Sequence, residues 1–213
     1  LSIVLLLALR VTDPTALQSV RGQTFDAYQQ LDELKHSNDI VLLNIGEKSL
    51  NKFGQYPFPR QTYAQLVIDV ATKNGGVLGW TIMFPEVDRF QGDPVFAEML
   101  MQNKVNVPGA RRNPINFNVI SQTPSTRGIK TSGPHIGTGT IGPVPATNYL
   151  LKWPNLVTNI PIIESVANGK GVNASAPQPD NQTRTYPLAI TVGERIYPSF
   201  AIEMLRVKQG QKS

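Results

Sequence analysis

The chain of 213 residues contains no cysteine and only two histidines. The absence of cysteine excludes disulfide bonds, thiolate catalysis and cysteine-ligated zinc or iron–sulfur centres. Neither a Gly-x-Ser-x-Gly elbow nor a His-Glu-x-x-His helix accompanies His36 and His135, so two common hydrolase signatures are missing. The sequence therefore gives little support to nucleophilic catalysis, and we expect no cofactor.

Clusters of positive charge are scarce as well. The chain carries 20 Lys and Arg against 15 Asp and Glu, yet its densest basic position is the pair Arg111-Arg112. Nucleic-acid surfaces combine clustered cations with aromatic side chains on which bases stack, and this pair has few aromatic neighbours. We therefore expect no nucleic-acid partner. With 40% hydrophobic and 16% charged residues, the composition is that of a folded globular domain.

No hydrophobic run reaches the length of a membrane-spanning helix. The apolar run Leu1–Leu9 would span about 13 Å as a helix, less than half of a ~30 Å hydrocarbon core. The chain does not start with Met, so we interpret this run as the outer end of a transmembrane or signal-anchor helix that begins upstream. A helix buried in the core is the alternative. The expected organisation is a membrane-anchor helix end at 1–10, one domain at 11–208 and the start of a linker at 209–213.

The sequence after residue 38 alternates between strand and helix patterns. Ile40–Ile45 is apolar and rich in β-branched residues, which predicts a strand covered on both faces. A predicted helix over 61–73 ends at Asn74-Gly75-Gly76, and a second buried strand follows over 76–84. This order predicts a right-handed βαβ unit in which 40–45 and 77–83 are adjacent parallel strands.

Further helices and strands flank this unit. Asp13 and Pro14 predict a helix start, with a break near Gly22, and Asp93 starts another helix. Residues 109–147 are rich in Gly, Pro, Ser, Thr and Asn, which predicts short strands and surface turns. Strands are expected near 171–173 and at 185–192, and residues 105–107 could form a further short strand. A last helix is expected over 200–207, beginning at Ser199. The fold class predicted is α/β, with a mixed, partly parallel sheet flanked by helices in a single domain.

The order of several short motifs resembles the CHASE2 domain family. The first strand is followed by Glu47-x-Ser49-Leu50 and then by Gly54-x-x-Pro57-Phe58-Pro59-Arg60, a helix, and a strand that ends in Phe84. Near the C-terminus come Asp180-x-x-x-Arg184 and the helix start Pro198-Ser199. The resemblance covers residues 25–208, with 105–158 unmatched. Because each motif is short, the specificity of the resemblance comes from their order and spacing.

This resemblance implies a function. CHASE2 domains are extracytoplasmic sensors of bacterial transmembrane receptors, so the chain is expected to be a periplasmic or extracellular ligand-sensing domain and not itself an enzyme. Membrane helices would follow Ser213 and lead to a cytoplasmic kinase or nucleotide-cyclase domain. The expected partners are the membrane, through the N-terminal helix, a small molecule of unknown identity, and a second copy of the chain. Helix shifts or rotation in that homodimer would carry the signal.

A ligand site is predicted at the carboxyl-terminal edge of the sheet, where ligands bind in open α/β folds. The family pattern often has acidic residues at the positions of Gly46 and Thr81, so the family's own arrangement is lost or rebuilt here. The candidate ligand-binding residues are Glu47, Arg60, Glu86 and Asp93, with Asp88 close by in the sequence. Oxygen-rich clusters of this kind can bind calcium or magnesium, and whether a metal binds is left open.

Structural roles are the alternatives for these residues. Asp93 is a natural helix N-cap, and Arg60 can form a salt bridge that fixes the proline-rich turn before it. Arg184 follows Asp180 in a turn and is expected to be structural too. Two other functions also remain open: a soluble α/β hydrolase or transferase whose apolar N-terminus is a core helix, and a structural or assembly subunit with a degenerate sensor fold.

Overall fold

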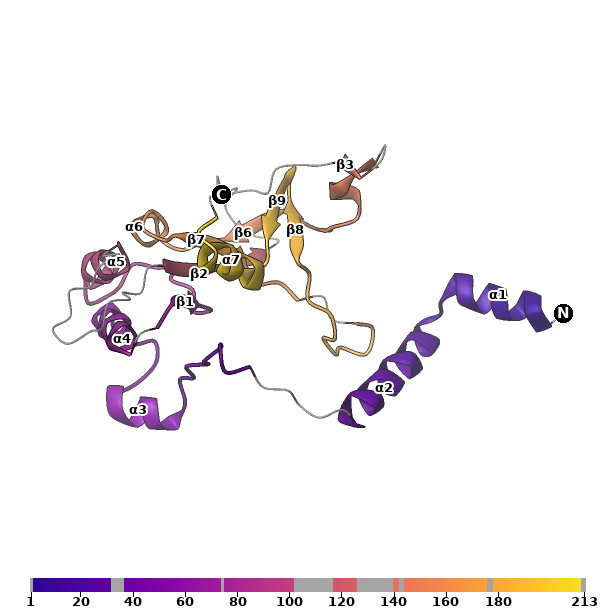
Figure 1. Ribbon diagram of the computed structural model, residues 1–213, viewed down its shortest axis with the longest axis horizontal. Helices are drawn as coiled ribbons and strands as arrows, with labels where there is room; N and C mark the ends of the chain where they lie inside the picture. The colour runs from indigo at the N-terminus through magenta and orange to yellow at the C-terminus, as the bar shows by residue number, and fades with distance from the viewer. Residues whose placement is uncertain are drawn as a thin grey trace. The chain divides into compact units, whose positions relative to one another are not determined.

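The computed structural model describes residues 2–31, 37–73, 75–101, 117–125, 140–141, 144–175 and 178–211 (Figure 1). These residues form two compact units. The smaller unit comprises Leu1–Ile45 and Ser175–Tyr186, and the larger comprises Gly46–Ala174 and Pro187–Ser213. The chain therefore crosses between the units three times, after residues 45, 174 and 186.

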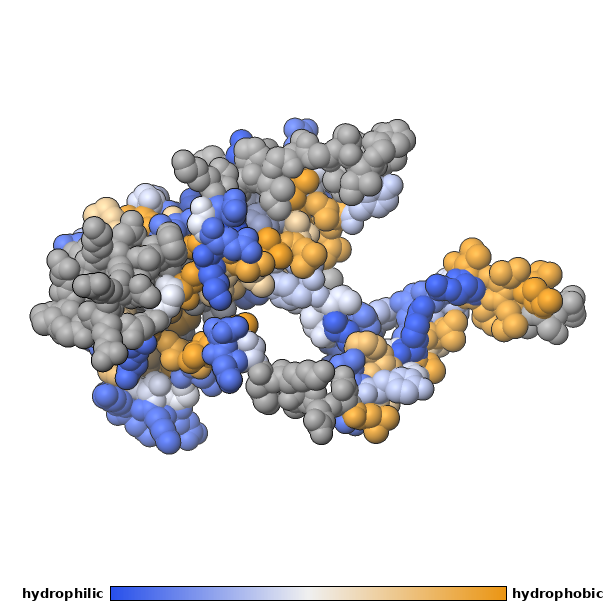
Figure 2. Space-filling view, in the orientation of Figure 1, coloured by the Kyte–Doolittle hydropathy of each residue, from blue (hydrophilic) through white to orange (hydrophobic). Residues whose placement is uncertain are grey.

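The smaller unit is built on two consecutive helices, α1 (Ser2–Thr12) and α2 (Thr15–Leu31). Asp13, between them, has a φ of 38°, so the helical path is interrupted there. The apolar N-terminal run forms the helix α1, and its Ile3, Leu6 and Leu7 side chains are exposed, so the alternative of a helix buried in the core is wrong. Figure 2 shows the hydrophobic surface over this helix. Among the helices of the described residues, none is long and apolar enough to cross a bilayer.

Two predictions for the smaller unit are wrong. α2 continues through Gly22 without a break, because the neighbouring turns supply enough helix-forming residues. Ile40–Ile45 is not a strand, and the side chains of Ile40 to Leu43 are between 53% and 88% exposed. A β-branched run has the propensity of a strand, but it also needs a neighbouring backbone to pair with. Within the described residues this segment has no such partner.

The larger unit contains a mixed sheet of four strands. Its centre is β2 (Phe117–Ser125), which pairs in parallel with β1 (Val77–Trp80) and with β7 (Gly169–Val172). The end of β2 also pairs in antiparallel with β6 (Asn155–Val157). A second sheet has the order β5 (Leu151–Trp153), β8 (Ala189–Val192), β9 (Arg195–Pro198). A short pair, β3 (Thr140–Ile141) and β4 (Val144–Pro145), precedes the 3-10 turn η1 (Ala146–Asn148).

Helices cover both faces of the mixed sheet. Gly79 of β1 faces α7 (Phe200–Lys208), where an added Cβ would lie 2.5 Å from the Met204 sulfur. The next residue, Trp80, points to the opposite face because side chains alternate along a strand. There it joins an aromatic core with Tyr63 of α4 (Arg60–Thr72) and Phe96 of α5 (Asp93–Met101), with ring centroids 5.3 to 6.1 Å apart. α5 packs against α4 and α6 (Pro161–Glu164), while α3 (Glu47–Phe53) precedes α4.

The predicted mixed, partly parallel α/β fold with flanking helices is therefore confirmed. The single domain and the N-terminal membrane-anchor helix of that prediction are not shown, since the described residues form two compact units and include no helix able to span a membrane. The predicted βαβ unit is wrong in its pairing, since β1 pairs with β2 and not with 40–45. The region predicted to form short strands and turns supplies the nine-residue central strand. The predicted helix at 200–207 is confirmed, and the Ser199 side chain accepts a hydrogen bond from the Ile202 N–H at its start. The possible strand at 105–107 and His135 lie outside the described residues.

Candidate functional site

Arg60 is the centre of a buried polar cluster in the larger unit. It is the first residue of α4, directly after the Pro57-Phe58-Pro59 turn, and its guanidinium lies 4.5 Å from the ring centroid of Phe84. Its Nε donates to Asp93 Oδ1 at 3.0 Å, and its Nη2 donates to the main-chain oxygen of Glu86 at 2.9 Å. The charge of Arg60 is thus matched by one buried carboxylate and by a carbonyl dipole.

Asp88 and Asp93 extend this cluster to the backbone. Asp88 Oδ2 accepts hydrogen bonds from the main-chain N–H of Arg60, at 3.3 Å, and of Gly92, at 3.0 Å. The Asp88 N–H in turn donates to Asp93 Oδ2 at 2.7 Å. Pro59, the N-cap of α4, has no side-chain oxygen, so Asp88 caps this helix from 28 residues away. The network fixes the loop between β1 and α5 against the start of α4.

The four predicted site residues are only partly brought together. The structure joins Arg60 to one of the predicted acids, Asp93, and it uses Glu86 through its backbone, with the side chain exposed. Glu47 lies in the first turn of α3 with an exposed side chain. No group of three or more potential metal ligands occurs within the residues that the structure describes. Ligand binding by these four residues stays a prediction, because the contacts that are formed are internal to the protein.

A second polar network, which sequence reasoning missed, is organised by Glu164 of α6. Glu164 Oε1 accepts from Gln122 Nε2 at 3.0 Å and from the Asn159 N–H at 3.2 Å, and Oε2 pairs with Lys170 Nζ at 3.3 Å. Asn159 Oδ1 accepts the Phe84 N–H at 2.7 Å. The network therefore connects the segment after β1 with β2 and β7 on the side covered by α6. No motif marks these residues, since their partners are far apart in the sequence.

Some buried polar atoms of the larger unit have no hydrogen-bond partner within the described residues. They are the Oε1 of Gln122, the Nε1 of Trp80 and the hydroxyl of Tyr63. The Glu164 carboxylate can only accept hydrogen bonds, so the NH2 group of Gln122 must point towards it. The Gln122 atom left without a partner is therefore its oxygen, an acceptor. Burial also raises the pKa of the Tyr63 hydroxyl to about 12. These atoms belong to the packed core beside the sheet.

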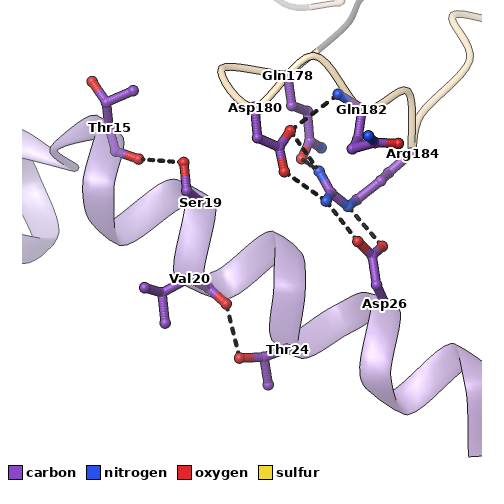
Figure 3. A network of polar contacts seen from close by, with 9 residues as sticks. All are labelled: Thr15, Ser19, Val20, Thr24, Asp26, Gln178, Asp180, Gln182 and Arg184. Atoms are coloured by element: carbon purple, nitrogen blue, oxygen red, sulfur yellow. Dashed lines mark hydrogen bonds and ion pairs between the residues drawn. The ribbon is translucent and has the colours of Figure 1, made fainter.

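The smaller unit holds the most complete polar cluster, centred on Arg184 (Figure 3). Arg184 Nε and Nη2 donate to the two oxygens of Asp26, on α2, at 2.8 and 2.7 Å. Nη1 and Nη2 donate to the two oxygens of Asp180 at 3.0 and 2.7 Å, and Nη1 also donates to Gln178 Oε1 at 2.8 Å. A guanidinium has five N–H groups, and each can be assigned to one of these bonds. We call Arg184, Asp26 and Asp180 the Arg184 clamp.

The clamp holds α2 against the loop over residues 178–185. Hydrogen bonds from Arg184 lower the pKa of both Asp26 and Asp180, and the two carboxylates raise the pKa of Arg184. Gly22 makes the contact possible, because a Cβ at this position would lie 2.9 Å from the guanidinium carbon of Arg184. The sequence placed Arg184 after Asp180 in a turn and predicted a structural role, and the structure shows the two residues paired. The second carboxylate bound by Arg184, that of Asp26, lies 158 residues away in the sequence, and no sequence motif indicated this contact.

A hollow of about 310 Å³ lies beside the clamp, between α2 and the same loop. Gly22, Phe25 and Pro179 form part of its wall, together with the amide side chains of Gln18 and Gln178. At its edge Arg21 pairs with Asp13 at 2.6 Å. Its charged lining groups, Asp13, Arg21 and Arg184, are each paired within the protein.

Comparison with known proteins gives one result. A family model described as the CHASE2 domain matches residues 1–213, which is the whole chain. No curated protein and no solved structure matches the chain. The match includes residues 105–158, which the sequence motifs left unmatched.

Proposed function

The chain belongs to the CHASE2 domain family, a family of sensor domains of signalling receptors, and we propose that it is the ligand-sensing domain of a membrane-bound receptor, placed outside the cytoplasm. The observation that carries this proposal is the family match over the full length of the chain. Because the family is sensory, the match gives no support to the alternative of a soluble hydrolase or transferase.

The smaller unit supports the membrane part of the proposal. α1 is apolar over most of its length, and its exposed side chains include Ile3, Val4 and Val11. Exposed apolar surface of this extent on a soluble protein marks a binding surface, and for a short apolar helix a bilayer is a suitable environment. α2 follows α1 after only two residues, so it is the first element that a movement of α1 would reach.

Signalling requires that a ligand binds two arrangements of the domain with different affinity. In the proposed receptor this difference is transmitted through helices to a cytoplasmic kinase or nucleotide cyclase. The ligand is a small molecule whose identity the residues do not specify. Glu47 and Glu86, whose side chains are exposed, remain candidates for contacting it, whereas Arg60 and Asp93 hold each other.

The absence of cysteine from this chain makes the proposed location testable. In the full-length protein, with any cysteine outside this chain replaced by serine, Thr183→Cys places one thiol at an exposed loop position. A maleimide that cannot cross membranes should label this thiol in intact cells to the same extent as in lysed cells. Labelling that requires lysis would overturn the extracytoplasmic placement. The same protein without the substitution is the control for labelling elsewhere.

A further inference from the structure

α2 has one face that is occupied within its own unit. Gln18, Gly22 and Asp26 are spaced by four residues and lie one above the other on the helix. Asp26 pairs with Arg184, Gly22 is covered by the Arg184 guanidinium, and Gln18 lines the hollow beside them. This face of α2 is therefore held by the loop over residues 178–185.

The opposite face of α2 carries a second regular pattern. Leu17, Val20, Thr24, Ala27 and Leu31 follow one another at alternating intervals of three and four residues. With about 100° of rotation per residue, they form a stripe about 80° wide whose centre lies about 180° from Gly22. We call this stripe the α2 seam. Its repeat of 3.5 residues is that of the a and d positions of a coiled coil.

The α2 seam is exposed along its whole length in the described structure. Leu17, Val20 and Leu31 are 43%, 59% and 82% exposed, and Thr24 and Ala27 are exposed as well. The Thr24 hydroxyl donates to the Val20 carbonyl oxygen at 2.8 Å, so its polar group is already satisfied within the helix. Thr24 therefore presents its methyl group to the seam. Figure 3 shows Val20 and Thr24 on the side of α2 away from Asp26.

We propose that the α2 seam is a dimerisation surface that packs against the α2 seam of a second copy of this chain, in a parallel arrangement. A stripe with a 3.5-residue repeat is complementary to a copy of itself, and a two-fold axis brings identical stripes together. The small side chains of Thr24 and Ala27 at the middle of the seam allow the two helices to approach closely there.

The residues on either side of the α2 seam are compatible with packing against a second copy of the helix. The e positions hold Arg21 and Tyr28, and the g positions hold Ala16, Gln23 and Gln30. The only charged residue among these five is Arg21, which pairs with Asp13. No like charges would face each other across a parallel pair of these helices. A helix that binds a membrane surface carries several Lys or Arg beside its apolar face, and α2 has only Arg21. The pattern therefore favours a second helix over a lipid surface.

The parallel arrangement rests on the proposed function, because two copies anchored in one membrane through α1 present α2 in the same direction. The seam itself does not depend on it. Cross-linking of the purified 213-residue chain tests the seam without a membrane, so its result is independent of the location experiment described above.

Single-cysteine variants of this cysteine-free chain test directly whether two α2 seams contact each other. Val20→Cys, Thr24→Cys and Ala27→Cys should form disulfide-linked dimers under mild oxidation several-fold more efficiently than Ser19→Cys and Gln29→Cys. Equal yields at all five positions, or no dimer at any of them, would overturn the proposal. Association through the apolar α1 would give no dependence on position within α2. In an antiparallel pair, only a residue at the centre of the seam, such as Thr24, would face its own copy. A disulfide at Thr24 but not at Val20 would therefore refute the parallel arrangement.

A charge substitution supplies the second measurement. Val20→Glu places a carboxylate in the seam, and two such carboxylates would face each other in the dimer. Gln29→Glu adds the same charge at an exposed position off the seam. In sedimentation experiments over a range of concentrations, the wild type and Gln29→Glu should dimerise and Val20→Glu should remain monomeric. A monomeric wild type, or dimerisation unaffected by Val20→Glu, contradicts the proposal.

Discussion

Replacing Asp93 by alanine should destabilise the larger unit strongly, whereas replacing Glu86 by alanine should not. Asp93 and Arg60 form a pair with side chains only 6% and 9% exposed, so removing the carboxylate leaves a buried guanidinium without its counter-charge. Breaking a buried ion pair in this way costs about 3–5 kcal/mol. The exposed Glu86 side chain makes no hydrogen bond or ion pair in the described part of the chain, and its substitution keeps the backbone oxygen that Arg60 uses.

The size of the effect follows from what each substitution leaves unpaired. Asp93→Ala also removes the acceptor of the Asp88 N–H, and an unpaired buried donor costs about 1–3 kcal/mol, although the two costs overlap. Asp93→Asn keeps one oxygen for this N–H but loses the charge and the second acceptor, because its NH2 group would face the Arg60 Nε–H. Since one of the two hydrogen bonds survives, its effect should be intermediate. A double variant, Arg60→Met with Asp93→Leu, removes both charges and should recover the part of the loss that comes from the unpaired guanidinium, because a well-packed apolar pair can replace a buried ion pair. The Asp88 N–H stays unpaired in this variant, so the recovery should be incomplete.

Urea denaturation is the assay. For slopes of roughly 2–3 kcal/mol per M, Asp93→Ala should lower the midpoint by about 1–2 M, and Glu86→Ala should leave it within about 0.2 M of the wild type. If Asp93→Ala fails to fold, Asp93→Asn still gives a measurable midpoint. Equal midpoints for Asp93→Ala and Glu86→Ala would refute the structural role of the pair, and Arg60 and Asp93 would again be candidates for contacting a ligand.

Three further predictions concern single groups. Because hydrogen bonds from Arg184 lower the pKa of Asp26 and Asp180 below the ordinary 3.8, their stabilisation is present above that value and is lost as the pH falls through the lowered values. Protection of the α2 amides against hydrogen exchange, measured relative to the intrinsic exchange rate at each pH, should therefore fall below about pH 4, and Asp26→Asn should reduce that dependence. Gly22→Ala should displace the Arg184 guanidinium and weaken protection of the loop over 178–185, despite the better helix propensity of alanine; unchanged protection would contradict the contact. Burial raises the pKa of the Tyr63 hydroxyl from 10.0 to about 12, so the stability that its neutral form contributes is lost as the pH rises from 10.0 towards 12. Tyr63→Phe should remove a late-titrating component from the tyrosinate absorbance, and an unchanged titration would contradict its burial.

Local chemistry was sufficient to predict several elements of the fold. Ser199 caps α7 as expected, and α4 begins at Arg60, where the proline-rich turn ends. The central strand β2 was not predictable, because Phe117–Ser125 contains Asn, Ser and Pro and has none of the usual alternation. Pairing with three distant strands makes it a strand. Ile40–Ile45 shows the reverse case, in which strand propensity without a pairing partner leaves the segment irregular.

The candidate site was predictable to a similar degree. Arg60 and Asp93 could be assigned to the same candidate site because each lies at a recognisable start of a helix. The Glu164 network and the contact of Asp26 with Arg184 could not, since each joins residues from separate elements with no motif at either end. Contacts of this kind depend on the tertiary arrangement, and sequence spacing alone carries no information about them.

The central claim is the proposal that this chain is the sensing domain of a membrane receptor and transmits a signal through α2, and the output of the proposed full-length receptor tests it most directly. The Thr24→Cys variant, reconstituted in lipid vesicles, can be compared in its oxidised and reduced forms by the rate at which its cytoplasmic part consumes nucleoside triphosphate. Gln29→Cys controls for effects of the reductant on the rest of the protein. The account predicts that the two forms of Thr24→Cys differ in this rate, because the disulfide holds two α2 helices in one arrangement. Identical rates from a fully cross-linked and a fully reduced receptor would contradict it.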